Sequence, residues 1–159
     1  MPPRRVIAGA VVVVVAFAAI LLVPHGGDGG TLSKPEYETK VRTVYADVQD
    51  AFRKTNVPSS RLLAARVAEA QSELRRAADE LDDAKPPGAI ARENDQLVAG
   101  MRAYADDLEE LRGAAERGDS AGVATFNQSI PQNTAVQQIA EAAEEMKFEG
   151  YDLGPISEE

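Results

Sequence analysis

Apolar side chains recur at helical spacing over most of this chain. Beyond residue 32, four successive segments place them at steps of three and four, which gathers them on one face of a helix. The four sets are Tyr37, Val41, Val44, Tyr45, Val48 and Phe52; Leu63, Val67, Ala70, Leu74, Ala77 and Leu81; Ile90, Asn94, Leu97, Met101, Tyr104, Leu108 and Leu111; and Val123, Phe126, Ile130, Val136, Ile139, Ala143 and Met146. We therefore predict four amphipathic helices, the third with one polar member, Asn94.

Capping and breaking residues separate the four segments. Residues 33–36 (Ser-Lys-Pro-Glu) match a capping box and start the first helix, which is expected to run to Asn56. Two prolines at 86–87 end the second helix, Gly118 ends the third, and Pro131 interrupts the fourth within residues 128–133. Helices of similar length with short turns favour antiparallel neighbours. The expected fold is all-α: an up-down four-helix bundle whose fourth helix is kinked or broken near Pro131.

An uninterrupted uncharged run, Val6 to Val23, precedes the bundle and follows Arg4 and Arg5. Its length falls within the roughly 17–25 residues of a transmembrane helix. The arginines before it predict an N-in/C-out, single-pass protein of the cell membrane with its domain outside the cytoplasm. The alternative is a secreted protein, cleaved from a signal peptide at Ala16-Phe17-Ala18.

The expected organisation follows from this topology. It comprises a short cytoplasmic N-terminus (1–5), a transmembrane signal anchor (6–23), a glycine-rich flexible linker (24–32), an extracytoplasmic helical bundle (33–147) and a C-terminal tail (148–159).

Composition excludes several classes of function. The 159-residue chain has 17 basic and 26 acidic residues and a net charge of −9, which repels nucleic acid. It has no cysteine, and its one histidine, His25, lies in the linker, so no Cys-His or Ser-His-Asp arrangement can form. We therefore expect no catalytic residue, cofactor or metal, and a protein that is not an enzyme.

Two acidic groups need separate consideration, because carboxylates can bind calcium. Residues 79–83 and 106–110 are rich in Asp and Glu but lack the spacing of a calcium loop. Arg75, Arg76, Arg102 and Arg112 lie close enough in sequence to pair with them. A solvated, ion-paired face is the expected arrangement.

Several short motifs together carry a resemblance. The export segment, the sequence 32–37 (Leu-Ser-Lys-Pro-Glu-Tyr), the Pro86-Pro87 break and the Gly118-Asp119 turn resemble those of small uncharacterised extracytoplasmic helical proteins of actinobacteria, several of them lipoproteins. The resemblance implies the helical fold and no activity. Because cysteine is absent here, neither a lipid anchor nor a disulfide carries over.

Two sets of residues are candidates for binding. Asn94 interrupts an apolar face, and it either bonds a neighbouring backbone group and sets the helix register or joins the polar residues of the break, Asn127, Gln128, Gln132 and Asn133, in a small polar pocket. The tail carries four apolar side chains, Phe148, Tyr151, Leu153 and Ile156. They either cover the base of the bundle, beginning with Phe148, or bind a partner, with membrane contact a third option.

The function expected from these features is a non-enzymatic, membrane-tethered module that binds a protein or cell-envelope partner. The alternative is a ligand-sensing bundle that signals through a partner protein. An interaction module should expose an apolar patch, whereas a sensor should hold a cavity near the break.

Overall fold

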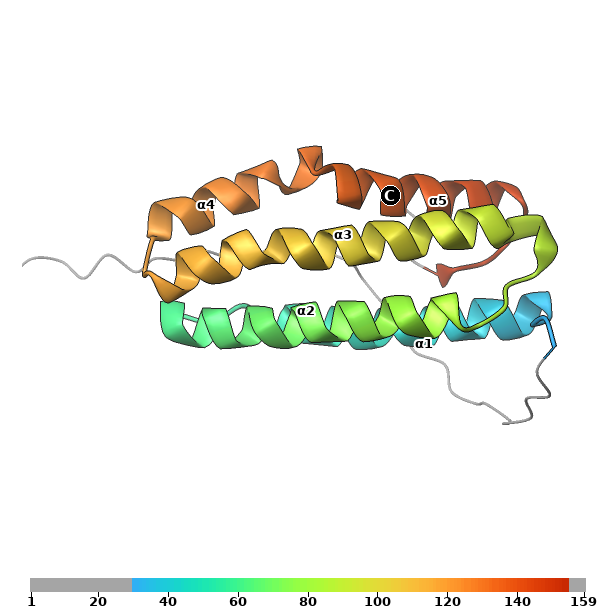
Figure 1. Cartoon of the computed structure of the whole chain (residues 1–159), viewed down its shortest axis with the longest axis horizontal. Helices are drawn as coiled ribbons and strands as arrows, with labels where there is room; N and C mark the ends of the chain where they lie inside the picture. The colour runs from blue at the N-terminus through green and yellow to red at the C-terminus, as the bar shows by residue number, and fades with distance from the viewer. Residues whose placement is uncertain (1–29, 155–159) are drawn as a thin grey trace, which may run out of the picture.

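Residues 30–154 of the computed structural model form an antiparallel helical bundle (Figure 1). Its helices are α1 (Lys34–Arg53), α2 (Ser60–Asp82), α3 (Ala91–Glu116), α4 (Ser120–Ser129) and α5 (Thr134–Phe148). Short 3-10 turns, η1 (Gly88–Ile90) and η2 (Ile130–Gln132), precede α3 and separate α4 from α5. Within these residues there is no strand, so the all-α prediction is confirmed.

The core lies where α3 packs between α2 on one side and α4 and α5 on the other, with α1 alongside α2 (Figure 1). Most members of the four predicted apolar faces are buried, and Tyr45, Phe52, Ile130, Val136 and Ile139 are half-buried. The core is rich in alanine, which lets helix axes approach closely.

The first helix begins as predicted and ends early. The Glu36 carboxylate accepts hydrogen bonds from the Ser33 backbone N–H at 2.8 Å and from the Ser33 hydroxyl at 2.6 Å, and these bonds lower the pKa of Glu36. At the other end α1 stops at Arg53, not at the predicted Asn56. The reason is Thr55, whose hydroxyl and backbone N–H both donate to the Phe52 carbonyl and close the last turn.

Helices α3 and α5 approach each other closely at Gly100. A Cβ atom at this position would lie 2.9 Å from the Ile139 side chain and 3.2 Å from the Ala135 carbonyl oxygen. Gly100 is buried, and no larger residue fits without moving α5. This contact fixes the distance between the two helices.

Ion pairs tie α2 to α3 on the solvent side. The Arg75 guanidinium lies 2.8 Å from the Asp106 carboxylate, and that of Arg102 lies 2.8 Å from both Asp79 and Asp82. The acidic residues 79–83 and 106–110 therefore form the solvated, ion-paired face that was expected. These particular pairs join two helices, whereas sequence spacing suggested pairs within one.

The fourth helical segment is broken at the predicted place. Helix α4 ends at Ser129, η2 contains Pro131, and Asn133 has extended backbone angles. The Asn133 side-chain oxygen accepts a hydrogen bond from the Val136 N–H at 3.0 Å and caps α5. Proline ends one helix and asparagine starts the next, so the break is encoded at both ends.

The predicted anchor, residues 6–23, lies outside the described residues, as does Ile156. Among residues 30–154, no helix is both long enough and apolar enough to cross a membrane.

Candidate functional site

Asn94 belongs to a buried hydrogen-bond network at one end of the bundle. Its side-chain oxygen accepts from the Tyr37 hydroxyl of α1 at 2.8 Å, and its Nδ2 donates to the Leu81 carbonyl of α2 at 3.2 Å. Asn94 is 1% exposed and Tyr37 is fully buried, and this burial raises the pKa of Tyr37. The network links α1, α2 and α3, which matches the structural alternative for Asn94.

The polar residues of the break lie elsewhere. The Asn133 Nδ2 donates to the Asp107 carboxylate of α3 at 2.8 Å. Asp107 and Asn94 are roughly 20 Å apart along α3, at about 1.5 Å per residue. The structure therefore does not bring Asn94 together with the residues of the break in one pocket.

The four residues of the break instead line the outside of the bundle. Gln128 and Gln132 are exposed, and Asn127 and Asn133 are half-buried. The Asn127 side-chain oxygen is buried and has no hydrogen-bond partner. Of these amides, the exposed ones of Gln128 and Gln132 present donors and acceptors to solvent beside the junction of α4, η2 and α5.

The tail divides into a buried part and an exposed residue. Tyr151 is 7% exposed and packs edge-on against the Tyr37 ring at 6.0 Å, while Leu153 is fully buried. Phe148, by contrast, is 91% exposed. The tail does cover this end of the bundle, but the prediction that Phe148 begins the cover is wrong.

The reversal at Gly150 explains the difference. Gly150 has φ +82°, a left-handed conformation that favours glycine, and it turns the chain back toward the core after α5. The next residues therefore bury their side chains, whereas Phe148 stays on the outward face of the last turn of α5.

Polar contacts with α1 hold the returning segment. The Lys34 ammonium donates to the Gly150 carbonyl at 2.5 Å. The Arg42 guanidinium donates to the Asp152 carbonyl at 2.7 Å and lies 2.8 Å from its carboxylate, and the Asp152 N–H donates to Glu38 at 2.9 Å. The tail therefore belongs to the fold as far as Leu153.

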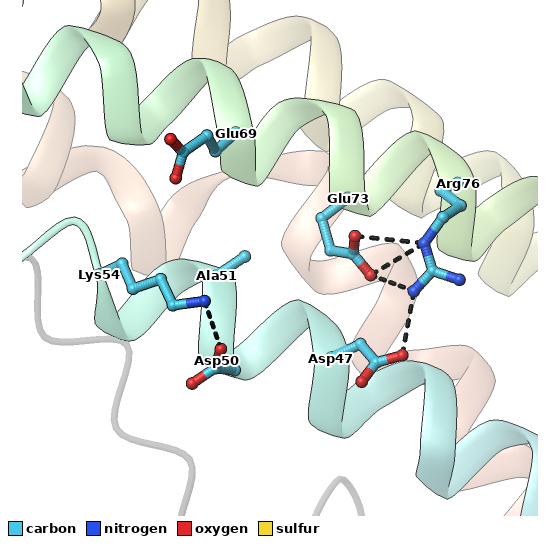
Figure 2. A pocket seen from close by; sticks show the side chains of 7 residues that line it. All are labelled: Asp47, Asp50, Ala51, Lys54, Glu69, Glu73 and Arg76. Atoms are coloured by element: carbon cyan, nitrogen blue, oxygen red, sulfur yellow. Dashed lines mark hydrogen bonds and ion pairs between the residues drawn. The ribbon is translucent and has the colours of Figure 1, made fainter.

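A shallow hollow of about 290 Å³ lies between α1 and α2 (Figure 2). It is lined by Asp47, Asp50, Ala51, Lys54, Glu69, Glu73 and Arg76. The Lys54 ammonium lies 2.6 Å from the Asp50 carboxylate, and Arg76 bonds both Asp47 and Glu73. The hydrogen bond to Lys54 lowers the pKa of Asp50, and that to Glu73 raises the pKa of Arg76.

The hollow is therefore a solvent-exposed groove lined by ion-paired side chains. No Ser, Thr, Cys or His lines it. Nowhere in residues 30–154 do three Asp, Glu, His or Cys side chains gather closely enough to hold a metal ion.

The most unusual surface is one that the apolar pattern did not single out. Residues 120–140 contain no Asp, Glu, Lys or Arg, although these make up 27% of the chain. The stretch covers α4, η2 and the first half of α5, and many of its side chains are exposed. We call the outer surface of residues 120–140 the neutral face. A scan for gaps between charges would have found it in the sequence.

Beneath the neutral face lie partly buried aliphatic side chains. Ile130, Val136 and Ile139 pack against the core and remain half-buried. The exposed positions around them carry small or amide side chains, including Ala124, Gln128, Gln132, Gln137 and Ala140. The face combines modest apolar area with uncharged hydrogen-bonding groups.

Comparison with protein-family models, with curated proteins and with solved structures found no match to this chain.

Proposed function

We propose that this protein is a non-enzymatic, membrane-tethered extracytoplasmic module that binds a protein partner through its neutral face. The observation that carries the proposal is the absence of Asp, Glu, Lys and Arg over residues 120–140, whereas the rest of the bundle is densely charged. Charged residues are depleted at the centres of protein interfaces, because each one must be stripped of water on binding.

The structure of the break supports this choice of surface. Exposed Gln128 and Gln132 can exchange hydrogen bonds with a partner without burying an ion. The neutral face thus offers both apolar contact and unfilled hydrogen-bonding capacity.

The membrane tether is part of the proposal and rests on the sequence. The uncharged run 6–23 behind Arg4 and Arg5 is the anchor, and the bundle is outside the cytoplasm. Cleavage after Ala18 would release the same binding module as a secreted protein. Partner binding does not depend on which of the two forms is mature.

The alternative of a ligand-sensing bundle gains no support from the described residues. A ligand sensor was expected to hold a cavity beside the break. The hollow between α1 and α2 is lined by ion-paired side chains from residues 47–54 and 69–76, none of which belongs to the break.

Site-specific crosslinking in native membranes tests the proposal. A photo-crosslinking amino acid at Gln128 or Gln132 is expected to capture a defined partner, identified by mass spectrometry. The matched control places the same group at Ser72, which is exposed on α2. Equal capture from Ser72, or no capture from the break, would overturn the assignment of the neutral face as the binding surface.

A further inference from the structure

The outward side of α5 carries a stripe that begins in the neutral face and runs to the end of the helix. Thr134, Gln137, Glu141, Glu144 and Phe148 follow steps of three and four, and all five are exposed. The first two lie in the neutral face. Phe148, at 91% exposed, ends the stripe with the most exposed large apolar side chain among residues 30–154.

We propose that this stripe is a self-association surface, on which α5 packs antiparallel against α5 of a second copy about a two-fold axis near Ile139. The proposal rests on the proposed function and names the partner of the same face. Positions equally far on either side of Ile139 then meet. Phe148 of each copy lies opposite Ile130 and η2 of the other, where a half-buried aliphatic side chain and the proline of the break receive the ring.

The same register places an uncharged side chain opposite each carboxylate of the stripe. Glu144 lies opposite Thr134, and Glu141 lies opposite Gln137 of the other copy. A hydroxyl and an amide N–H are both donors for a carboxylate oxygen. In a parallel arrangement each glutamate would instead lie opposite the same glutamate of the other copy, and the two like charges would repel each other.

The charge of the chain explains why a second copy would meet here. With a net charge of −9, two copies that approach by most faces bring carboxylates together. The neutral face is the long stretch of described surface where this repulsion is absent. A basic partner would instead bind more strongly to the acidic faces of the chain. The lack of charge on the neutral face therefore favours a partner that is itself acidic, such as a second copy of this chain.

The extent of the stripe predicts a weak complex. From Ile130 to Phe148 it is roughly 27 Å long at about 1.5 Å per residue, and one helix is about 10 Å wide. That footprint is smaller than the roughly 800 Å² per partner of a standard interface. We therefore expect a dimer that is measurable at high concentration or when both copies share a membrane.

Antiparallel pairing is compatible with two tethers in one membrane. The two-fold axis must then run along the membrane normal, so that the bundles lie side by side and flat. Each chain leaves the described structure at Gly30, beside the end of α5, where Lys34 contacts Gly150. Residues 24–30 reach at most about 25 Å, which allows both copies to lie close to the bilayer.

Cysteine crosslinking tests the register, because the chain has no cysteine of its own. In full-length protein in native-like membranes, Ala140→Cys lies beside the proposed axis and is expected to give crosslinked dimers with a short bis-maleimide. The control Ser72→Cys, exposed on α2, is expected to stay monomeric. Equal dimer yields from both variants, or none from Ala140→Cys, would refute the pairing.

A second comparison tests the role of Phe148. Phe148→Asp is expected to weaken the dimer about tenfold or more by sedimentation of the full-length chain, because an apolar contact is replaced by a buried charge. Leu62→Asp changes the other exposed large apolar residue among residues 30–154, at 41% exposed, and should leave dimerisation unchanged. Equal dimer affinities for Phe148→Asp and the unmodified chain would reject the proposal.

The two proposals can fail separately. If Gln128 captures another protein while no dimer forms, the neutral face binds a partner and self-association is wrong. If Gln128 captures nothing and no dimer forms, both are wrong.

Discussion

At the scale of single residues, a few polar side chains determine how the helices meet. The pair formed by Tyr37 and Asn94 is the most deeply buried of them, and it connects three helices through two side chains. A buried amide or hydroxyl that loses its partner costs about 1–3 kcal/mol. The alignment of α1, α2 and α3 at this end of the bundle therefore depends on the side-chain oxygen and nitrogen of Asn94.

A double-mutant cycle measures that dependence. Asn94→Ala is expected to lower the free energy of unfolding by about 2–4 kcal/mol, since it removes the oxygen acceptor of the Tyr37 hydroxyl and one donor to the Leu81 carbonyl and opens a cavity. Tyr37→Phe should cost less, about 0.5–1.5 kcal/mol. Urea denaturation followed by circular dichroism gives both values and that of the double variant. Strictly additive effects would mean that the hydrogen bond contributes nothing.

At the scale of helical elements, small residues decide how closely α3 packs. Two of its glycines differ sharply in their surroundings. At Gly100 an added Cβ would press on Ile139 and on the backbone of α5, whereas at Gly113 it would meet only the end of the Arg117 side chain, 3.1 Å away. One glycine is required by packing and the other is not.

This contrast yields a matched pair of substitutions. Gly100→Ala is expected to destabilise by about 1–3 kcal/mol, because α5 must move outward to admit the methyl group. Gly113→Ala should stabilise by up to about 1 kcal/mol, since alanine favours the helix and Arg117 can move aside. Thermal melting of both variants compares them directly. A gain in stability for Gly100→Ala would show that α5 yields without cost.

The elements themselves were largely readable from the sequence. The apolar faces repeat at steps that depend only on local residues, so positions such as Leu74 were predicted to be buried and are. The break at Pro131 was likewise a local signal. Contacts between helices were not predictable, because the pairing of Arg75 with Asp106 depends on how α2 and α3 are aligned.

The error at Phe148 had a local cause that the sequence did contain. Adjacency to buried Met146 suggested burial, yet two residues along a helix rotate a side chain by about 200°, to the opposite face. Counting from exposed Glu144 gives the correct side. The buried roles of Tyr151 and Leu153, by contrast, depend on the reversal at Gly150 and on contacts with α1.

At the scale of the whole molecule, residues 150–153 return to the start of α1. The first helix and the segment after the last helix therefore lie in contact. Lys34 and Arg42 of α1 hold backbone and side-chain oxygens of residues 150–152, and Lys34 also lies 4.9 Å from the centre of the Tyr151 ring. A partner that bound the end of the chain would therefore also act on the first helix.

Removing this segment tests its contribution to the fold. Truncation after Glu149 is expected to destabilise strongly, because full burial of an apolar side chain contributes roughly 1.5–3 kcal/mol and both Tyr151 and Leu153 are lost. Phe148→Ala, in the exposed residue beside it, should leave the free energy of unfolding within about 0.5 kcal/mol of the original. Urea denaturation of the full-length and truncated chains supplies the comparison. If truncation leaves stability unchanged while Phe148→Ala lowers it, the cover at this end is formed by Phe148 and not by the returning segment.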